Sequence, residues 1–175
     1  MRTDIVLTLT GADRIGIVEQ VTGVLLGLEG NIETSRMVRL GGEFALLMLV
    51  SIPDERSADL DTAVSALTAD GFRVTTGPTH SNGTPYGDWL PYQVSVTGAD
   101  HEGIIHEIAA GLSQGGINIE SMDTVTEAAP VSGAPLFSMT AVVLVPPGLA
   151  EDEWMGALAE AGDLANVDIE VASGP

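Results

Sequence analysis

A stretch of twelve residues occurs twice in the sequence, and this repeat limits the folds that the chain can adopt. TGADRIGIVEQV at positions 10–21 returns as TGADHEGIIHEI at positions 97–108, an offset of 87 residues. Over the 24 positions from 10 to 33 the two copies share ten identities, among them the triplets that start at Asn31 and Asn118. Because a solenoid repeat is shorter and needs three or more units, the spacing predicts two copies of one domain.

The first copy contains alternating and helical apolar patterns in a fixed order. A helical stripe is predicted at Ile15, Val18, Val21, Leu25 and Leu28, with Gly30 ending the helix. Gly41 and Gly42 predict a two-residue hairpin turn between two strands. The predicted order is strand 4–10, helix 15–28, strand 31–40, strand 43–52, helix 57–70 and strand 72–76.

The second copy repeats this order. Its predicted elements are strand 92–97, helix 103–115, strand 117–126, strand 136–145, a helix near 151–161 and strand 167–171. About six extra residues lie in its hairpin, around AAPVSGAP at positions 128–135.

Two βαβ crossovers in one unit imply the ferredoxin-like split motif. We therefore predict an α+β protein with two βαββαβ domains in tandem, each an antiparallel sheet with both helices on one face. The predicted domains are 1–79 and 92–175. The segment 80–91, HSNGTPYGDWLP, is rich in turn residues and is predicted to be a linker.

The segment FALLMLV at positions 44–50 is apolar on both faces of its strand. Since the helices cover only one face of such a sheet, we expect the open face of the first sheet to pack on another domain or subunit. The alternative is an ordinary central strand with scattered apolar residues.

The charge of the chain excludes several classes of partner. The net charge is −19, and all six basic residues are arginines. Such a surface repels nucleic acid and the anionic membrane leaflet, so we expect neither as a direct partner. The chain has no cysteine, no apolar run long enough to span a bilayer and no pattern of a signal peptide. We expect a soluble, cytoplasmic protein.

The repeated turn predicts a small polar site. We expect Gly11 to turn the chain, Asp13 to cap the following helix, and Gly16 to lie at its third position. A carboxylate would fit at that helix N-terminus, and the amide of Asn31 could contact a carboxylate or an ammonium group. The alternative is that Asp13 and its counterpart are helix caps only, and that both asparagines only satisfy local backbone groups.

Catalytic and metal sites have little support in the sequence. Asp100, His101, Glu102 and His106 resemble a metal cluster, but the two histidines are five residues apart and do not share a helical face well. GLSQG at positions 111–115 matches a nucleophile elbow, but it lies between a helix and a strand, which is the reverse context. We expect no enzyme activity, no metal and no cofactor.

The D-x-x-G turn, the helix and the G-x-N-I start of the next strand resemble the ACT domain, a small-molecule sensing module of amino-acid metabolism. Both halves carry the pattern, T-G-A-D-R-I-G with E-G-N-I and T-G-A-D-H-E-G with G-I-N-I. The tandem arrangement, with APVSGAPLFSM at positions 129–139, is most similar to the glycine cleavage system transcriptional repressor family.

The resemblance implies a ligand site between paired domains, formed by the first strand–helix loop and the start of the second strand. By position it implies these ligand-binding residues: Gly11, Asp13, Gly16, Asn31, Ile32, Gly98, Asp100, Gly103, Asn118 and Ile119. Many ACT domains have proline before the loop glycine, whereas this chain has Ile15 and Glu102. Glu102 adds a negative charge, so the second loop is expected to bind another ligand or none.

The resemblance also implies a function. We expect a regulator that binds a small amino acid such as glycine and acts through a protein partner, for which a DNA-binding regulator is one candidate. A homodimer is the expected assembly. The alternative is a structural interaction module without a ligand.

Overall fold

The computed structural model describes residues 1–79, 86–130 and 132–174. The chain divides into two compact units, residues 1–82 and 83–175, which are described separately below. Residues 80–85 of the predicted linker and Val131 of the longer hairpin lie outside the described residues. Strand β5 begins at Leu90, so the last two residues of the predicted linker belong to the second sheet.

The first unit follows the predicted order of elements, with a short 3-10 helix added before the second helix. Its elements are β1 (Arg2–Ala12), α1 (Ile17–Gly27), β2 (Asn31–Leu40), β3 (Glu43–Pro53), η1 (Asp54–Asp59), α2 (Leu60–Ala69) and β4 (Arg73–Pro78). The second unit contains β5 (Leu90–Ala99), α3 (Ile104–Gln114), β6 (Asn118–Ala128), β7 (Pro135–Val145), α4 (Glu151–Ala165) and β8 (Val167–Ser173).

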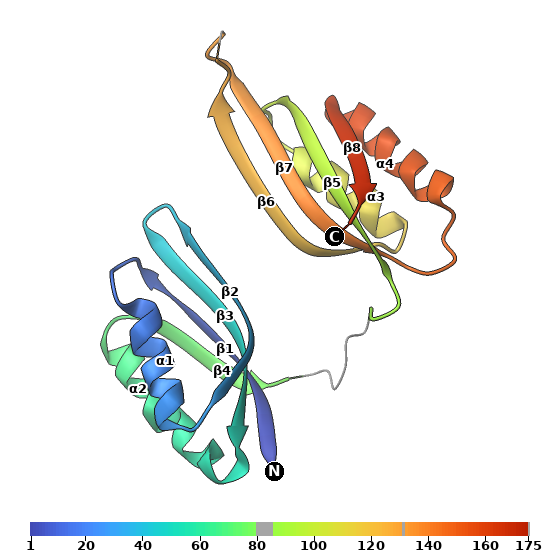
Figure 1. Cartoon of the computed structure of the whole chain (residues 1–175). Coiled ribbons are helices and arrows are strands. Elements are labelled where there is room, and N and C mark those ends of the chain that lie inside the picture. The colour runs from blue at the N-terminus through green and yellow to red at the C-terminus, as the bar shows by residue number, and fades with distance from the viewer. Residues whose placement is uncertain (80–85, 131, 175) are drawn as a thin grey trace. The chain divides into compact units, whose positions relative to one another are not determined.

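Each unit contains one antiparallel sheet with four strands. The strand orders are β2-β3-β1-β4 and β6-β7-β5-β8, so the same topology occurs twice. In each unit both helices cover one face of the sheet and leave the other face open (Figure 1). The predicted α+β fold of two tandem βαββαβ domains is confirmed.

The cores lie between each sheet and its helices. On α1 the buried residues are Ile17, Val21 and Leu25, at steps of four residues. The predicted stripe was wrong at its start, since Ile15 is fully exposed and Val18 is 40% exposed. Ile15 lies before the helix, which begins at Ile17, and Ile17 takes the buried position one turn before Val21 in place of Val18.

The helix ends differ from the prediction in both units. Gly16 and Gly103 are the N-cap residues, with φ of 92° and 98°, and no side chain caps either helix. The prediction that Asp13 caps α1 was therefore wrong, as was the helical position predicted for Gly16. At the other end of α1 the left-handed residue is Glu29, with φ of 56°, and the amide of Gly30 donates to the Leu25 carbonyl at 2.8 Å.

Glycines at two places have different roles. Gly41 and Gly42 both have positive φ, so the predicted tight hairpin between β2 and β3 is confirmed. Gly11 instead lies inside β1, where it pairs with Phe44. A Cβ at Gly11 would lie 2.6 Å from the Phe72 ring, so its role is close packing and the predicted turn at this residue was wrong.

No helix in the described parts of the chain has the length and hydrophobicity needed to cross a bilayer.

Candidate functional site

The loop between β1 and α1 is held against the tip of the β2–β3 hairpin. Asp13 Oδ2 lies 2.7 Å from Arg39 Nε on β2, and the Asp13 amide donates to the Gly42 carbonyl at 2.9 Å. In the second unit the Asp100 amide donates to the Pro135 carbonyl at 3.1 Å. Each aspartate therefore fixes the loop to the neighbouring hairpin instead of capping the helix.

The N-termini of α1 and α3 are open at their glycines. A Cβ placed on Gly16 or Gly103 would meet no atom within 4 Å. The first helical bond of each helix is accepted by the carbonyl of this glycine, at 2.9 Å from Gln20 and 3.0 Å from Glu107. The amides of the first turn thus remain available as donors at the positive end of the helix, which favours an anion.

The second group of predicted residues lies at the start of an edge strand. Asn31 and Ile32 begin β2, and Asn118 and Ile119 begin β6. In both strands the register shifts immediately after the isoleucine, between Ile32 and Thr34 and again after Ile119. Such a bulge redirects side chains and is common beside binding sites.

The side chain of Asn31 already has one partner. Its Nδ2 donates to Glu33 Oε1 at 2.7 Å. The carbonyl oxygen of this amide and the second oxygen of Glu33 are both acceptors. Glu33 and its counterpart Glu120 are part of the repeated triplet but were not among the predicted site residues. Their identity in both copies was the available signal.

The two groups of predicted residues lie at opposite ends of each sheet. Gly11 pairs with Phe44 on β3, whereas Asn31 pairs with Ser51, seven residues further along the same strand. Seven residues of strand span about 24 Å. A single domain therefore does not bring the loop and the asparagine together, and each domain presents the predicted residues as two separate groups.

The residue after the loop aspartate has a similar role in both units. Arg14 lies 3.8 Å from Asp70 Oδ2, just after α2, and stacks over the Phe72 ring at 5.1 Å. Its counterpart His101 contacts the carbonyl of Ala165, the last residue of α4, through Nε2 at 2.6 Å. A basic side chain thus ties each loop to the C-terminal end of the second helix, a favourable place for a cation. The sequence signal was the basic residue at equivalent positions in both copies.

Protonation controls the contacts of His101. Its Nδ1 lies 3.0 Å from the Glu102 carbonyl oxygen, so both ring nitrogens face acceptors. Only the imidazolium can donate from both nitrogens. Hydrogen bonds to Glu102 and Ala165 raise the pKa of His101 above its ordinary value of 6.5, and Asp100 acts in the same direction.

We expect the stability of the second unit to depend on pH through His101. A pKa raised in the folded state adds stability that is fully present below the unfolded pKa and is lost as pH rises through the folded value. His101→Ala should therefore lower the thermal midpoint more at about pH 6 than at about pH 8. Thermal melts followed by tryptophan fluorescence measure this difference, since both tryptophans belong to the second unit. His106→Ala, on the exposed side of α3, is the control. An equal effect of His101→Ala at both pH values would contradict the prediction.

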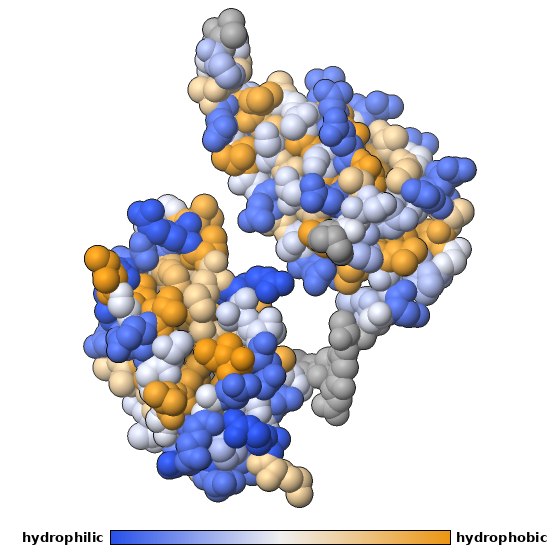
Figure 2. Space-filling view, in the orientation of Figure 1, coloured by the Kyte–Doolittle hydropathy of each residue, from blue (hydrophilic) through white to orange (hydrophobic). Residues whose placement is uncertain are grey.

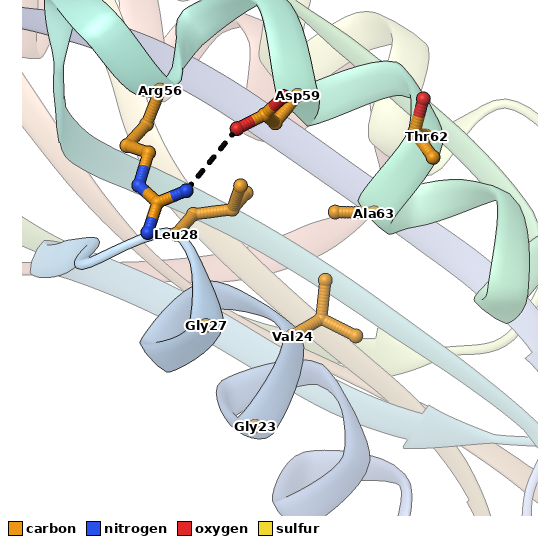
Figure 3. Close-up of a pocket in the computed structure, with 8 residues that line it drawn as sticks. All are labelled: Gly23, Val24, Gly27, Leu28, Arg56, Asp59, Thr62 and Ala63. Carbon is orange, nitrogen blue, oxygen red and sulfur yellow. Dashed lines mark hydrogen bonds and ion pairs between the residues drawn. The ribbon is translucent and has the colours of Figure 1, made fainter.

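A groove lies between α1 and α2 of the first unit, away from all ten predicted residues (Figure 3). Its volume is about 400 Å³, and it is lined by Gly23, Val24, Gly27, Leu28, Arg56, Asp59, Thr62 and Ala63. In the second unit a Cβ on Gly111 would lie 2.9 Å from Ala161, so α3 and α4 pack closely. Val24 occupies the position equivalent to Gly111 and keeps α1 and α2 further apart.

The charged group at the edge of this groove is already paired. Arg56 lies 3.3 Å from both Glu29 and Asp59, and these two carboxylates raise the pKa of its guanidinium. This groove could not be predicted from local patterns, because it depends on the separation of the two helices.

In the described residues, no group of three or more His, Asp or Glu side chains is placed to hold a metal ion.

The fold and the repeated loop define a tandem pair of ferredoxin-like domains with the same loop geometry in both. The profile of the ACT domain matches residues 3–74. A solved structure of an unknown protein from Galdieria sulphuraria is 34% identical, with each chain covered completely and a TM-score of 0.87. No curated protein matches the sequence.

A second solved structure has the same fold at lower identity. It is that of a candidate glycine cleavage system transcriptional repressor, 20% identical, with 98% of this chain and 97% of that chain covered and a TM-score of 0.73. The chain belongs to the ACT domain family. Over nearly its full length it has the fold of that candidate repressor.

Proposed function

We propose that this ACT protein is a regulator that binds a small amino acid where two ACT domains meet. One domain contributes the strand–helix loop, and a domain of a second copy of the chain contributes the start of β2 or β6. The observation that carries the proposal is the repeated pair of half-sites, an open helix N-terminus at a left-handed glycine and an asparagine before a strand bulge.

The chemistry of the two half-sites matches a zwitterion. The open amides at Gly16 favour the carboxylate of an amino acid. The Asn31 carbonyl oxygen and the Glu33 carboxylate are acceptors suited to its ammonium group. Because the two half-sites lie at opposite ends of one sheet, the ligand would join two domains. We propose that these two domains belong to different copies of the chain in a homodimer.

The two loops are unequal as carboxylate sites. The first loop has Asp13 with two arginines, Arg14 and Arg39, whereas the second has Asp100, Glu102 and one titratable cation, His101. A carboxylate is attracted by the first set and repelled by the second. We therefore assign the first loop as the stronger site.

The signal would pass to a protein partner. A ligand shifts a conformational equilibrium only if it binds one arrangement better than another, and a ligand shared by two domains meets this condition. The fold similarity to a candidate transcriptional repressor suggests a role in transcription. Since a net charge of −19 opposes direct DNA binding, the partner would be a DNA-binding regulator.

A structural interaction module without a ligand is the second candidate. The pairing of Asp13 with Arg39 favours it, because this aspartate is already satisfied within its own unit.

A thermal-shift screen of the full chain with the twenty amino acids separates the two candidates. A ligand present at 100 times its dissociation constant stabilises the folded state by about 2.7 kcal/mol. We expect one small amino acid to raise the midpoint in proportion to the logarithm of its concentration. If none of the twenty does so, the structural module is the better description.

Replacing both strand-start asparagines should abolish this response. The variant Asn31→Ala with Asn118→Ala is expected to keep the midpoint of the free protein, because Asn31 is exposed and Asn118 is only half-buried. It should lose most of the ligand-induced shift, measured in the same screen. Ser65→Ala, an exposed polar truncation on α2, is the control and should respond as the unmodified chain does. A full ligand shift in the double variant would remove the asparagines from the site.

A further inference from the structure

The open face of the first sheet carries an apolar band. Residues directly opposite each other in an antiparallel pair point to the same face, so the strand register identifies its members. Val6, Val38, Leu40, Ala45, Leu47 and Leu49 form this band. Leu40 is 76%, Val38 52% and Leu47 49% exposed. Figure 2 shows hydrophobic surface at the end of this unit that holds the β2–β3 hairpin.

Two arginines flank the band. Arg36 lies opposite Leu47 on the outer strand β2, and Arg73 lies opposite Thr10 on the outer strand β4. The other four arginines bond to carboxylates or carbonyls of other elements. Among the described residues no carboxylate lies within ion-pair distance of Arg36 or Arg73. Both of these arginines therefore lie on this open face, together with two exposed acidic residues, Glu43 opposite Leu40 and Asp4 opposite Ser51.

The second unit is more acidic than the first and carries no arginine or lysine. Residues 1–82 contain 6 arginines and 11 acidic residues, a net charge of −5, whereas residues 83–175 contain 14 acidic residues and no arginine or lysine, a net charge of −14. By register, the open face of the second sheet carries Asp123 and Glu127 on β6 and Asp168 and Glu170 on β8. All four are exposed. Its central strand β7 presents the half-buried Val142 and Leu144 between these charges.

We propose that the open face of the first sheet binds the open face of the second sheet of another copy of this chain. Arg36 and Arg73 of the first face match acidic side chains of the second face in position. The cations are on the outer strands β2 and β4, and the acids are on the outer strands β6 and β8, with apolar side chains between them in both sheets. In sheets stacked with their strands nearly aligned, the outer strands of one lie over the outer strands of the other.

A two-fold dimer forms this contact twice. The first sheet of each copy would cover the second sheet of its partner, so that the symmetry closes and no face remains for further growth. One four-stranded sheet face is small for a stable protein interface, and its repetition gives the dimer twice the buried area. The dimer does not depend on a ligand, so its test is independent of the proposed amino-acid site.

Charge reversal in two separate chains tests which faces meet. One chain carries Arg36→Glu with Arg73→Glu, and the other carries Asp123→Arg with Glu170→Arg. Sedimentation velocity of the full chains should show a dimer for the unmodified protein and a dimer dissociation constant raised about tenfold or more for each variant alone. An equimolar mixture should regain dimers, because the two variant faces then meet each other and the reversed charges on one face oppose reversed charges of the other sign.

Each other result excludes the proposal. If the unmodified chain stays monomeric at about 100 μM, which is 100 times a micromolar dissociation constant, the dimer is excluded. Normal dimerisation of the chain with Asp123→Arg and Glu170→Arg would show that the acidic face is not in the contact. Failure of the mixture to regain dimers, while thermal melts show both variants folded, would exclude the pairing of these two faces.

A matched pair of leucine variants tests the apolar band. Leu47→Asp places a charge in the centre of the band. Leu26→Asp makes the same change at a leucine that is 76% exposed on α1, a helix on the other side of the sheet from the band. We expect Leu47→Asp to raise the dimer dissociation constant about tenfold or more, and Leu26→Asp to leave it within about twofold. Equal dissociation constants for the two variants would contradict the proposal.

Discussion

Replacing Trp154 with alanine is expected to lower the free energy of unfolding of the second unit by about 3–5 kcal/mol. Trp154 is 2% exposed and is the largest fully buried side chain of the chain's described residues. Its ring packs edge-on against Tyr92, with 5.1 Å between ring centroids. Since α4 covers the sheet through this residue, the cavity would open in the middle of the core, where neighbouring side chains cannot fill it.

Urea unfolding followed by circular dichroism measures this loss. Trp89→Ala is the control, because Trp89 is half-buried and its described ring contact is with Tyr86 alone, outside both cores. It should cost less than about 1 kcal/mol. A similar cost for both variants would show that Trp154 does not hold α4 on the sheet.

Gly98→Val is expected to destabilise the second unit by about 1–3 kcal/mol. Gly98 pairs with Val167 on β8, and a Cβ there would lie 2.7 Å from Val167 Cγ1 and 3.2 Å from its Cα. The branched side chain of Val167 cannot rotate away from the new Cβ. The Cα of Val167 is also close, and it can move only if strand β8 moves. The cost would therefore arise from packing between β5 and β8, with or without a ligand.

The same unfolding measurement, made without any amino acid, tests this second effect. Thr97→Val is the control, because Thr97 is exposed on the open face one residue earlier and the two side chains have nearly the same shape. It should change stability by less than about 0.5 kcal/mol. If Gly98→Val left stability unchanged but abolished ligand binding, Gly98 would be a ligand contact and not a packing residue.

The repeat and its periodicities were sufficient to predict the fold. Strand β2 was predicted at its observed bounds, and the two glycines after it predicted the hairpin turn. The order βαββαβ followed from these local patterns, and a right-handed crossover leaves few topologies for it. Tertiary packing did not need to be known, because each strand and helix was identified by its own apolar pattern.

The ends of the first helix could not be predicted from the same patterns. Asp13 has the right chemistry for an N-cap, but a partner distant in sequence, Arg39, binds it instead. The left-handed backbone at Gly16 then delays the helix until Ile17. Such competition between a local cap and a distant ion pair is decided by tertiary structure, which a local pattern does not contain.

The separation of the two half-sites was predictable and was missed. Helix α1 runs back along β1, so β2 must begin at the opposite end of the sheet from the loop. Gly11 and Asn31 therefore could not belong to one niche in one domain. The repeated motif contains both groups of residues, but only the topology shows that one domain cannot bring them together.

A crystal structure of the full chain with the amino acid found in the thermal-shift screen would test the central claim most directly. We predict density for the ligand with its carboxylate at the amides after Gly16 of one domain and its ammonium group at Asn31 or Asn118 of another. Density in the groove between α1 and α2, or beside the loop with no asparagine in contact, would contradict the proposed site.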